Sequence, residues 1–462
     1  PRTERPDVQQ HLSPPPRTER PDAKHFSPLR RTERSDVKHL TERLDAKYLG
    51  SPRTGRSDVE HLSPPRSEHR PVGPGDFEGV GDISGVTLSR YMTELERRQV
   101  VDGDLHYITL AIAEATAVIA DLVRKAPLRR AERPGGRRRT LDAEAGDVLR
   151  RALGHTGKPR TAAAEEEEGP LDLVITSGRY VCVFDPLDCS SNLDAGIPVG
   201  TVFGIFRRPE GSDGAEGEAL ESALQQDRDL VAAGYVFYTA STEMVLTFGR
   251  GVAGFTLDAE RLDFALTRPN VRIPSRGNIY SMNQANSVEW DEPMQQYLAD
   301  IQQGRGEAAC RYSQRYTGSM VGDVHCTLLY GGVFAHPADR EHQDGKLRLL
   351  YEAAPMSFLV EQAGGKAITG HSRIMDVRPV GAHQRVPVVL GSPEDVDECY
   401  GYYDRCNDPA LLLRCELRLR GALPACTKAC PAPWAHPSSP SSATATTTAA
   451  ANGHCRCGNR CA

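Results

Sequence analysis

The chain has 462 residues, of which 26% are charged, and a formal net charge of -6 at pH 7. This length has room for two or three domains. Positive and negative residues are mixed along the chain, which gives no reason to expect nucleic-acid binding. No apolar run approaches the length of a membrane span, and no signal segment opens the chain. We therefore expect a soluble protein without a nucleic-acid or membrane partner.

The two ends of the chain differ in composition from its middle. Residues 1–75 repeat a polar phrase of the form RTERPDV, and prolines and serines separate the copies. From about residue 410, Ser, Thr, Ala and Pro dominate and the sequence becomes low-complexity. Neither segment has enough apolar residues to bury a core, so we expect disordered tails over residues 1–75 and 410–462.

Cysteines are concentrated near the C-terminal end of the chain. Eight of the twelve lie between Cys399 and Cys461, but their spacing matches no standard zinc site. The other four are scattered through the middle of the chain, as reduced thiols of an intracellular enzyme would be.

The folded part is expected to begin with a helix near Asp104, which can cap its first turn. One apolar stripe recurs at steps of three and four residues and comprises Leu105, Ile108, Ile112, Ala115, Ile119 and Leu122. An Arg-rich and Gly-rich stretch from Leu128 then predicts a mobile loop.

The most informative segment of the chain is DPLDCSSNLD, residues 185–194, which follows an apolar and β-favouring run. The run predicts a strand covered on both faces, and Pro186 predicts that the strand stops at Asp185. Asp185, Asp188 and the carbonyl between them, that of Leu187, would offer oxygen ligands suited to Mg²⁺. Ser190 and Ser191 would offer donors to a phosphate beside the metal.

Further strands and helices alternate up to about residue 404 and predict a layered α/β fold, with helix and sheet layers in turn. VGTVFGIF from Val199, LVAAGYVFY and EMVLTFG are typical of strands. A later helix, opened by Glu352, ends at Gly364 and Gly365. In this position Glu352 meets the positive end of the helix dipole and can face a metal held by another strand.

Carboxylates from separate segments then point to one chemistry. Asp142, a glutamate at 165 or 166, Asp185, Asp188 and Glu352 would together hold two or three magnesium ions. A run of four glutamates such as residues 165–168 is, on its own, usually a solvated surface. With the other acids, it predicts metal-assisted hydrolysis of a phosphate ester.

From about Thr87 to Asp404 the chain resembles the fructose-1,6-bisphosphatase family, and more closely its plastid type. The phrases that carry the resemblance are DPLDCSSNLD, LVAAGY, RYTGSMVGDVHCTLLYGG, GKLRLLYEAAPMSFLVEQAGGK and HQRVPVVLGS. The related inositol monophosphatases share the first motif and a helix ending in AGG, but not RYTGSMVGDVH or KLRLLYE. Sedoheptulose-1,7-bisphosphatase is the nearer alternative.

The resemblance implies an N-terminal α/β half over residues 87–270 with the metal motif, and a C-terminal half over residues 271–405 that binds the sugar phosphate. It also implies a role for particular positions and a homo-oligomer, dimer or tetramer, in which Arg315 reaches a neighbouring subunit's site. Metal ligands would be Glu165, Asp185, the Leu187 carbonyl, Asp188 and Glu352. Asp142 and Glu166 would help to draw a proton from the attacking water. Substrate would contact Cys189, Ser190, Ser191, Asn283, Arg315, Tyr316, His336 and Lys346.

Several positions depart from the family pattern. Cys189 stands where the family has glycine, which would cost about 1 to 3 kcal/mol if the backbone there requires glycine. Gly146 replaces an asparagine, and His336 replaces an aromatic residue. The spacing from the glutamate run to Asp185 is one residue short, which leaves the register within residues 165–168 open.

The leading hypothesis is Mg²⁺-dependent hydrolysis of the 1-phosphate of fructose 1,6-bisphosphate. Two alternatives stay open: sedoheptulose 1,7-bisphosphate hydrolysis, and a catalytically weakened homologue that binds sugar phosphates. The resemblance to the plastid type implies the chloroplast stroma, with the cytoplasm as the alternative, because acidic residues in the N-terminal repeats are unusual for a transit peptide.

Overall fold

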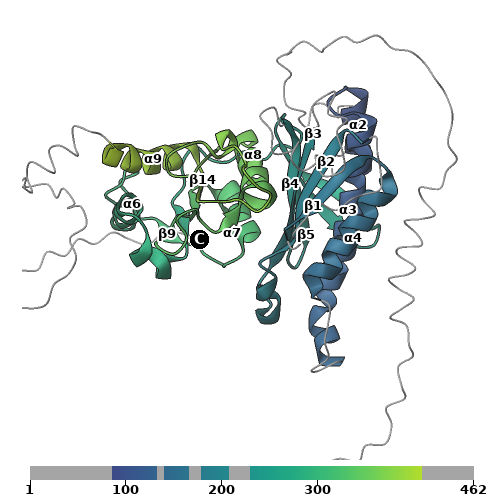
Figure 1. The fold of residues 1–462 in the computed structure, drawn as a ribbon, viewed down its shortest axis with the longest axis horizontal. Coiled ribbons are helices and arrows are strands. Elements are labelled where there is room, and N and C mark those ends of the chain that lie inside the picture. Colours follow the sequence, from purple (N-terminus) through teal and green to yellow (C-terminus); the bar gives the residue numbers. More distant parts are fainter. Residues whose placement is uncertain (1–85, 133–139, 166–177, 208–228, 408–462) are drawn as a thin grey trace, which may run out of the picture. The chain divides into compact units, whose positions relative to one another are not determined.

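A seven-stranded sheet forms the centre of the N-terminal half of the chain (Figure 1). The computed structural model describes residues 86–132, 140–165, 178–207 and 229–407. The expected tails, and the acidic residues 166–168, lie outside the described residues. The strands follow one another in chain order, and every neighbouring pair is antiparallel except the parallel pair β1 and β2. They are β1 (Pro159–Ala164), β2 (Tyr180–Asp188), β3 (Val199–Arg207), β4 (Asp229–Tyr238), β5 (Thr242–Thr247), β6 (Val252–Asp258) and β7 (Asp263–Arg268).

Both faces of this sheet are covered. Helices α2 (Leu88–Arg97), α3 (Gly103–Glu132) and α4 (Leu141–Thr156) pack on one face (Figure 1). Side chains from helices α7 and α8, whose bounds are given below, pack with those of the other face. Alternate residues of β2 therefore enter two different cores, Cys182 on the side of α3 and Val183 on the side of Leu350. This double cover explains why the β2 sequence is continuously apolar.

The strand β2 does not stop before its proline. It continues to Asp188, so the expectation that it ends at Asp185 is wrong. The pairing with β3 shifts register between Asp185 and Asp188, which places Pro186 in a bulge where a missing N–H is tolerated. The carbonyl of Pro186 accepts a hydrogen bond of 2.8 Å from the Thr201 hydroxyl. The bulge keeps two acidic residues on a strand rather than on a loop.

Helix α3 confirms the apolar stripe but not the expected cap. All six residues of the stripe are buried. The helix begins at Gly103, and the carboxylate of Asp102, not Asp104, accepts from the Leu105 N–H at 2.9 Å. Residues 128–132 continue the helix, so the loop expected from Leu128 begins later than predicted. The remainder of that loop, residues 133–139, lies outside the described residues.

The stretch Gly103–Leu128 of α3 is also long and apolar enough to cross a membrane by length and composition. The expectation that no apolar run has this length is therefore wrong. More than half of the stretch is buried inside the protein, as in a core helix. Its apolar stripe packs against the sheet and α4.

The C-terminal half is built on a five-stranded sheet in the order β12, β14, β10, β8 and β9. Its strands are β8 (Ile279–Ser281), β9 (Ser313–Gln314), β10 (Val333–His336), β12 (Lys366–Ile368) and β14 (Val388–Gly391). A separate short pair is formed by β11 (Leu347–Arg348) and β13 (Arg385–Val386). The helices are α6 (Glu292–Gln303), α7 (Met320–Tyr330), α8 (Ala354–Gln362) and α9 (Pro393–Asn407). Short helical turns are η3 (Ser190–Ala195), η4 (Gln284–Glu289), the π-helical η5 (Leu349–Ala353) and η6 (Ile374–Asp376).

Two leucines on α3 provide a matched test of its packing. Leu105 is 2% exposed in the core, whereas Leu128 is 67% exposed on the same helix. We expect Leu105→Ala to lower the free energy of unfolding by about 2 to 5 kcal/mol, because it leaves a cavity. Leu128→Ala should change it by less than about 0.5 kcal/mol. Urea unfolding followed by circular dichroism measures both, and equal losses would contradict the assigned orientation of the helix.

Candidate active site at the end of strand β2

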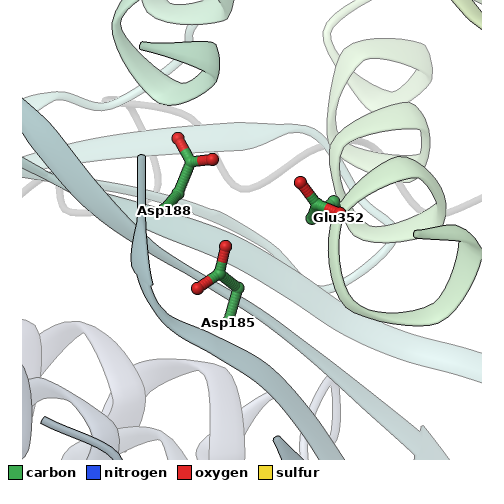
Figure 2. A group of neighbouring side chains, drawn as sticks. All are labelled: Asp185, Asp188 and Glu352. Atoms are coloured by element: carbon green, nitrogen blue, oxygen red, sulfur yellow. The ribbon is translucent and has the colours of Figure 1, made fainter. Parts of the chain in front are cut away.

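Three carboxylates meet where β2 ends. Asp185 and Asp188 project from the strand, and Glu352 projects from the π-helical turn η5 beside it (Figure 2). One ligand oxygen from each of the three lies within 4.8 Å of those of the other two. The side chains are almost fully buried, with 3%, 4% and 7% of the residue exposed for Asp185, Asp188 and Glu352. The structure thus confirms that these sequence-distant acids come together.

Glu352 reaches the cluster because η5 precedes α8. This places the carboxylate near the N-terminal end of α8, as the sequence predicted, although the turn is π-helical rather than the first turn of the helix itself. Its Oε2 atom accepts a hydrogen bond of 2.6 Å from the backbone N–H of Arg348. That bond fixes the carboxylate toward β2 rather than toward solvent.

The three carboxylates of the cluster repel one another, and their burial adds to the cost of ionising them. Burial, and then repulsion from Asp188 and Glu352, raises the pKa of Asp185 well above its usual range. Burial also raises the pKa of Asp188 to about 6 and that of Glu352 to about 8, with Glu165 adding to both shifts. A divalent cation between the carboxylates would remove this repulsion, and an all-oxygen donor set suits a hard cation.

Glu165 is brought to the same place by strand pairing. Ala164 at the end of β1 pairs with Phe184, and the Glu165 N–H donates to the Phe184 carbonyl at 3.2 Å. Glu165 therefore follows β1 directly beside Asp185. Its charge helps to raise the pKa of all three buried acids. The remaining glutamates of the run, including Glu166, lie outside the described residues.

Arg348 is part of the site and was not singled out from the sequence. Its Nε atom lies 2.6 Å from Oε1 of Glu165, and its backbone N–H holds Glu352. One residue of β11 thus links two of the predicted metal ligands. The phrase KLRLLYE contains Arg348, but its partner Glu165 lies in a distant segment, so no local spacing predicted the pair.

Asp142 lies at the N-terminus of α4, close to the cluster. Burial raises its pKa above the usual range, while a hydrogen bond with the Ser190 side chain opposes that shift. The charge of Glu165 raises it further, which shows that the two acids are near each other. Sequence analysis grouped Asp142 with the other acids, and the structure brings it to Ser190 and Glu165.

Cys189 occupies a strained backbone position between Asp188 and the turn η3. Its φ of 59° and ψ of 40° lie in the left-handed region, where a residue other than glycine is disfavoured. Its thiol donates to Asp188 Oδ1 at 3.3 Å. Ser190 and Ser191 follow as the first residues of η3, in the order the sequence predicted.

The N-terminus of α7 closes the site from another side. The N–H of Val321 donates to Asp188 Oδ2 at 3.2 Å. This close approach needs Gly200 on β3, because a Cβ there would lie 2.6 Å from the Val321 side chain. Asp323 was also missed from the sequence. Its buried carboxylate accepts from the Thr317 N–H at 2.8 Å and the Gly318 N–H at 3.2 Å, and so shapes the loop before α7.

The residues expected to bind the sugar phosphate all lie in the C-terminal half. Asn283 precedes η4, Arg315 and Tyr316 follow β9, and His336 ends β10. Lys346 comes immediately before β11 and lies two residues from Arg348. Burial, then Asp323 and Cys189, raise the pKa of Tyr316, and burial followed by Lys346 lowers the pKa of His336 to about 4. Arg315 and Tyr316 are exposed, as residues that meet a ligand or another subunit would be.

The raised pKa values predict a pH-dependent stability in the metal-free protein. Glu352 ionises near 4.5 when unfolded but near 8 when folded, so the folded state keeps its proton more tightly. The contribution of Glu352 to stability should therefore be largest below pH 4.5 and be lost as the pH rises to about 8. We expect Glu352→Gln to flatten this decline in the unfolding midpoint, measured between pH 5 and 8 in chelator. Glu260→Gln, an exposed control, should retain it, and an unchanged slope in Glu352→Gln would contradict the assignment.

Known proteins resemble the chain throughout its described part. The N-terminal domain model of fructose-1-6-bisphosphatase matches residues 86–269, and the C-terminal domain model matches residues 273–404. The chain is 41% identical over 334 residues to the chloroplastic fructose-1,6-bisphosphatase of Brassica napus, covering 68% of this chain and 81% of that protein. It is 41% identical over 327 residues to the cytosolic fructose-1,6-bisphosphatase of Oryza sativa subsp. indica, covering 69% and 95%.

A solved structure agrees with these sequence matches. The crystal structure of Leishmania major fructose-1,6-bisphosphatase in holo form aligns with a TM-score of 0.64 and 37% identity, covering 70% of this chain and 99% of that one. The layered α/β fold expected from the sequence is thereby confirmed. Because the two domain models together span more than half of the chain and its relatives are matched over most of their length, the chain belongs to the fructose-1,6-bisphosphatase family.

Proposed function

We propose that this protein hydrolyses the 1-phosphate of fructose 1,6-bisphosphate in a Mg²⁺-dependent reaction, giving fructose 6-phosphate and phosphate. The observation that carries this proposal is the buried group of Asp185, Asp188 and Glu352, whose mutual repulsion calls for a bound cation. Chloroplastic and cytosolic fructose-1,6-bisphosphatases among the relatives support the same reaction. The relatives do not favour the sedoheptulose or weakened-homologue alternatives.

The ligands proposed for the metal are Glu165, Asp185, Asp188, Glu352 and the Leu187 carbonyl. A divalent cation bound there would lower the pKa of a water and stabilise charge on the phosphoryl oxygens. Ser190 and Ser191 would hold the phosphate that leaves, next to the N-terminal end of α7, whose dipole favours an anion.

Asp142 is proposed as an acceptor for the proton of the attacking water. Burial raises the pKa of its carboxyl group, which makes the carboxylate a better base at neutral pH. Its hydrogen bond with Ser190 supports the role, because it ties the base to the proposed phosphate site. Glu166 is proposed to assist it.

The sugar and its remaining phosphate are proposed to contact Asn283, Arg315, Tyr316, His336 and Lys346. Cys189 is proposed to contact the substrate beside Ser190 and Ser191. We propose a homo-oligomer, a dimer or tetramer, in which the exposed Arg315 enters the site of a neighbouring copy. We also propose a location in the chloroplast stroma, with the cytoplasm as the alternative, since relatives of both kinds occur.

Phosphate release from fructose 1,6-bisphosphate tests the proposed reaction. We expect release that requires Mg²⁺, stops with chelator and returns when Mg²⁺ is added in excess. Asp185→Asn should lower kcat by at least about a hundredfold, because it removes a ligand charge at the reacting phosphate. Asp404→Asn makes the same chemical change at an exposed position of α9 and should leave kcat unchanged. No Mg²⁺-dependent release above background would rule out the proposal.

Replacing Cys189 tests how the strained residue affects the site. Cys189→Gly should raise the free energy of unfolding by about 1 kcal/mol relative to Cys189→Ala, because glycine adopts the left-handed conformation without strain. Thermal unfolding of the two variants makes this comparison. The wild type and Cys189→Gly should also be assayed on fructose 1,6-bisphosphate and sedoheptulose 1,7-bisphosphate.

We expect the higher kcat/KM on the fructose substrate in both proteins. A large rate gain in Cys189→Gly would show that the cysteine impairs the chemistry and would favour the weakened homologue. A preference for the heptulose would contradict the proposed substrate.

A further inference from the structure

Asp339 lies in the loop between β10 and β11, beside a lysine proposed to bind the substrate. One of its oxygens, Oδ2, is 3.0 Å from the Nζ atom of Lys346. The other, Oδ1, accepts from the backbone N–H groups of Glu341 at 3.1 Å and His342 at 2.7 Å. It also lies 2.9 Å from Nδ1 of the His342 ring. Four groups therefore hold one carboxylate in a fixed position.

This carboxylate is charged at neutral pH. Burial alone would raise its pKa, but hydrogen bonds from His342 and Lys346 outweigh burial and lower the pKa to about 2. The side chain of Asp339 is 7% exposed and that of Lys346 is 29% exposed. The carboxylate of the ion pair is thus largely shielded from water, whereas the Lys346 side chain is partly exposed.

The ion pair adjoins the rest of the site through β11. Lys346 is followed two residues later by Arg348, which binds Glu165. His336 is also proposed to contact substrate, and it lies close enough to Lys346 for the charge of the lysine to affect the pKa of its ring. Burial and then Lys346 lower the pKa of His336 to about 4, so its ring is neutral at pH 7. Lys346, rather than His336, therefore supplies the positive charge that would bind a phosphate. Asp339 offsets that charge.

We propose that Asp339 sets the affinity of the C-terminal half for the phosphate that stays on the sugar, by competing with that phosphate for the ammonium of Lys346. This inference rests on the proposed function, because it takes Lys346 as a phosphate ligand. A lysine has three N–H donors, and Asp339 occupies one of them. A phosphate dianion that approaches the other two is repelled by the fixed carboxylate. Asp339 is an affinity-setting residue that acts through Lys346, not a catalytic residue.

The substitution Asp339→Asn separates the charge from the loop structure. An asparagine side-chain oxygen still accepts from the N–H groups of Glu341 and His342, so the turn is kept while the negative charge is lost. Asp344→Asn is the matched control, because it removes the same charge from an exposed position of the same loop. Asp339→Ser, whose hydroxyl also accepts from turn N–H groups, replaces Asp339→Asn if the latter does not fold.

We expect Asp339→Asn to lower the KM for fructose 1,6-bisphosphate by about three- to tenfold, with kcat within about twofold of the wild type. Asp344→Asn should match the wild type. In a Lys346→Gln background, Asp339→Asn should no longer lower KM, because the interaction partner is gone. An unchanged or raised KM in Asp339→Asn, or the same decrease in the Lys346→Gln background, would overturn the proposal.

Calorimetric titration with fructose 6-phosphate tests the role of Asp339 independently of the proposed reaction, because it measures binding without hydrolysis. If the wild type does not hydrolyse the bisphosphate, the proposed function fails, but binding of the monophosphate can still be compared. Tighter binding by Asp339→Asn than by the wild type and Asp344→Asn would support the role of Asp339. Equal or weaker binding by Asp339→Asn, or no binding by any of these proteins, would refute it.

Discussion

The repulsion among Asp185, Asp188 and Glu352 is the interaction on which the rest of the site depends. Ionised carboxylates are costly to bury, and their raised pKa values record that cost. The fold tolerates the cost of burying these acids because β2 is packed on both faces by apolar cores. Strand β2 thus holds Asp185 and Asp188 in place, and η5 brings Glu352 beside them.

Positive side chains in the site are themselves held by acids. Lys346 and Arg348, immediately before and within β11, each pair with a carboxylate. Arg348 pairs with a proposed metal ligand, Glu165. Lys346 pairs with Asp339, which has no proposed part in catalysis. In each pair the acid offsets the charge of the cation.

Much of the fold and the candidate site was predictable from local patterns. The apolar stripe of α3, the double-faced strand β2 and the glycine-ended helix α8 follow from periodicity and turn chemistry. Errors arose where two local rules competed. Asp102 caps α3 although Asp104 is equally suited by type, and Pro186 is accommodated by a bulge rather than ending its strand. For Pro186 the choice was made by pairing with β3, a separate strand.

The sequence by itself determined the chemistry of this protein: a carboxylate-rich motif after a buried strand, with phrases shared by one family of sugar bisphosphatases. Tertiary structure decided which residues meet. It placed Glu165 beside Asp185 through strand pairing, and it revealed Arg348 as a partner of Glu165 and Asp339 as a partner of Lys346. Residue types and short spacings are local and can be read along the chain. Contacts between segments far apart in sequence depend on strand register and helix packing, which only the folded chain specifies.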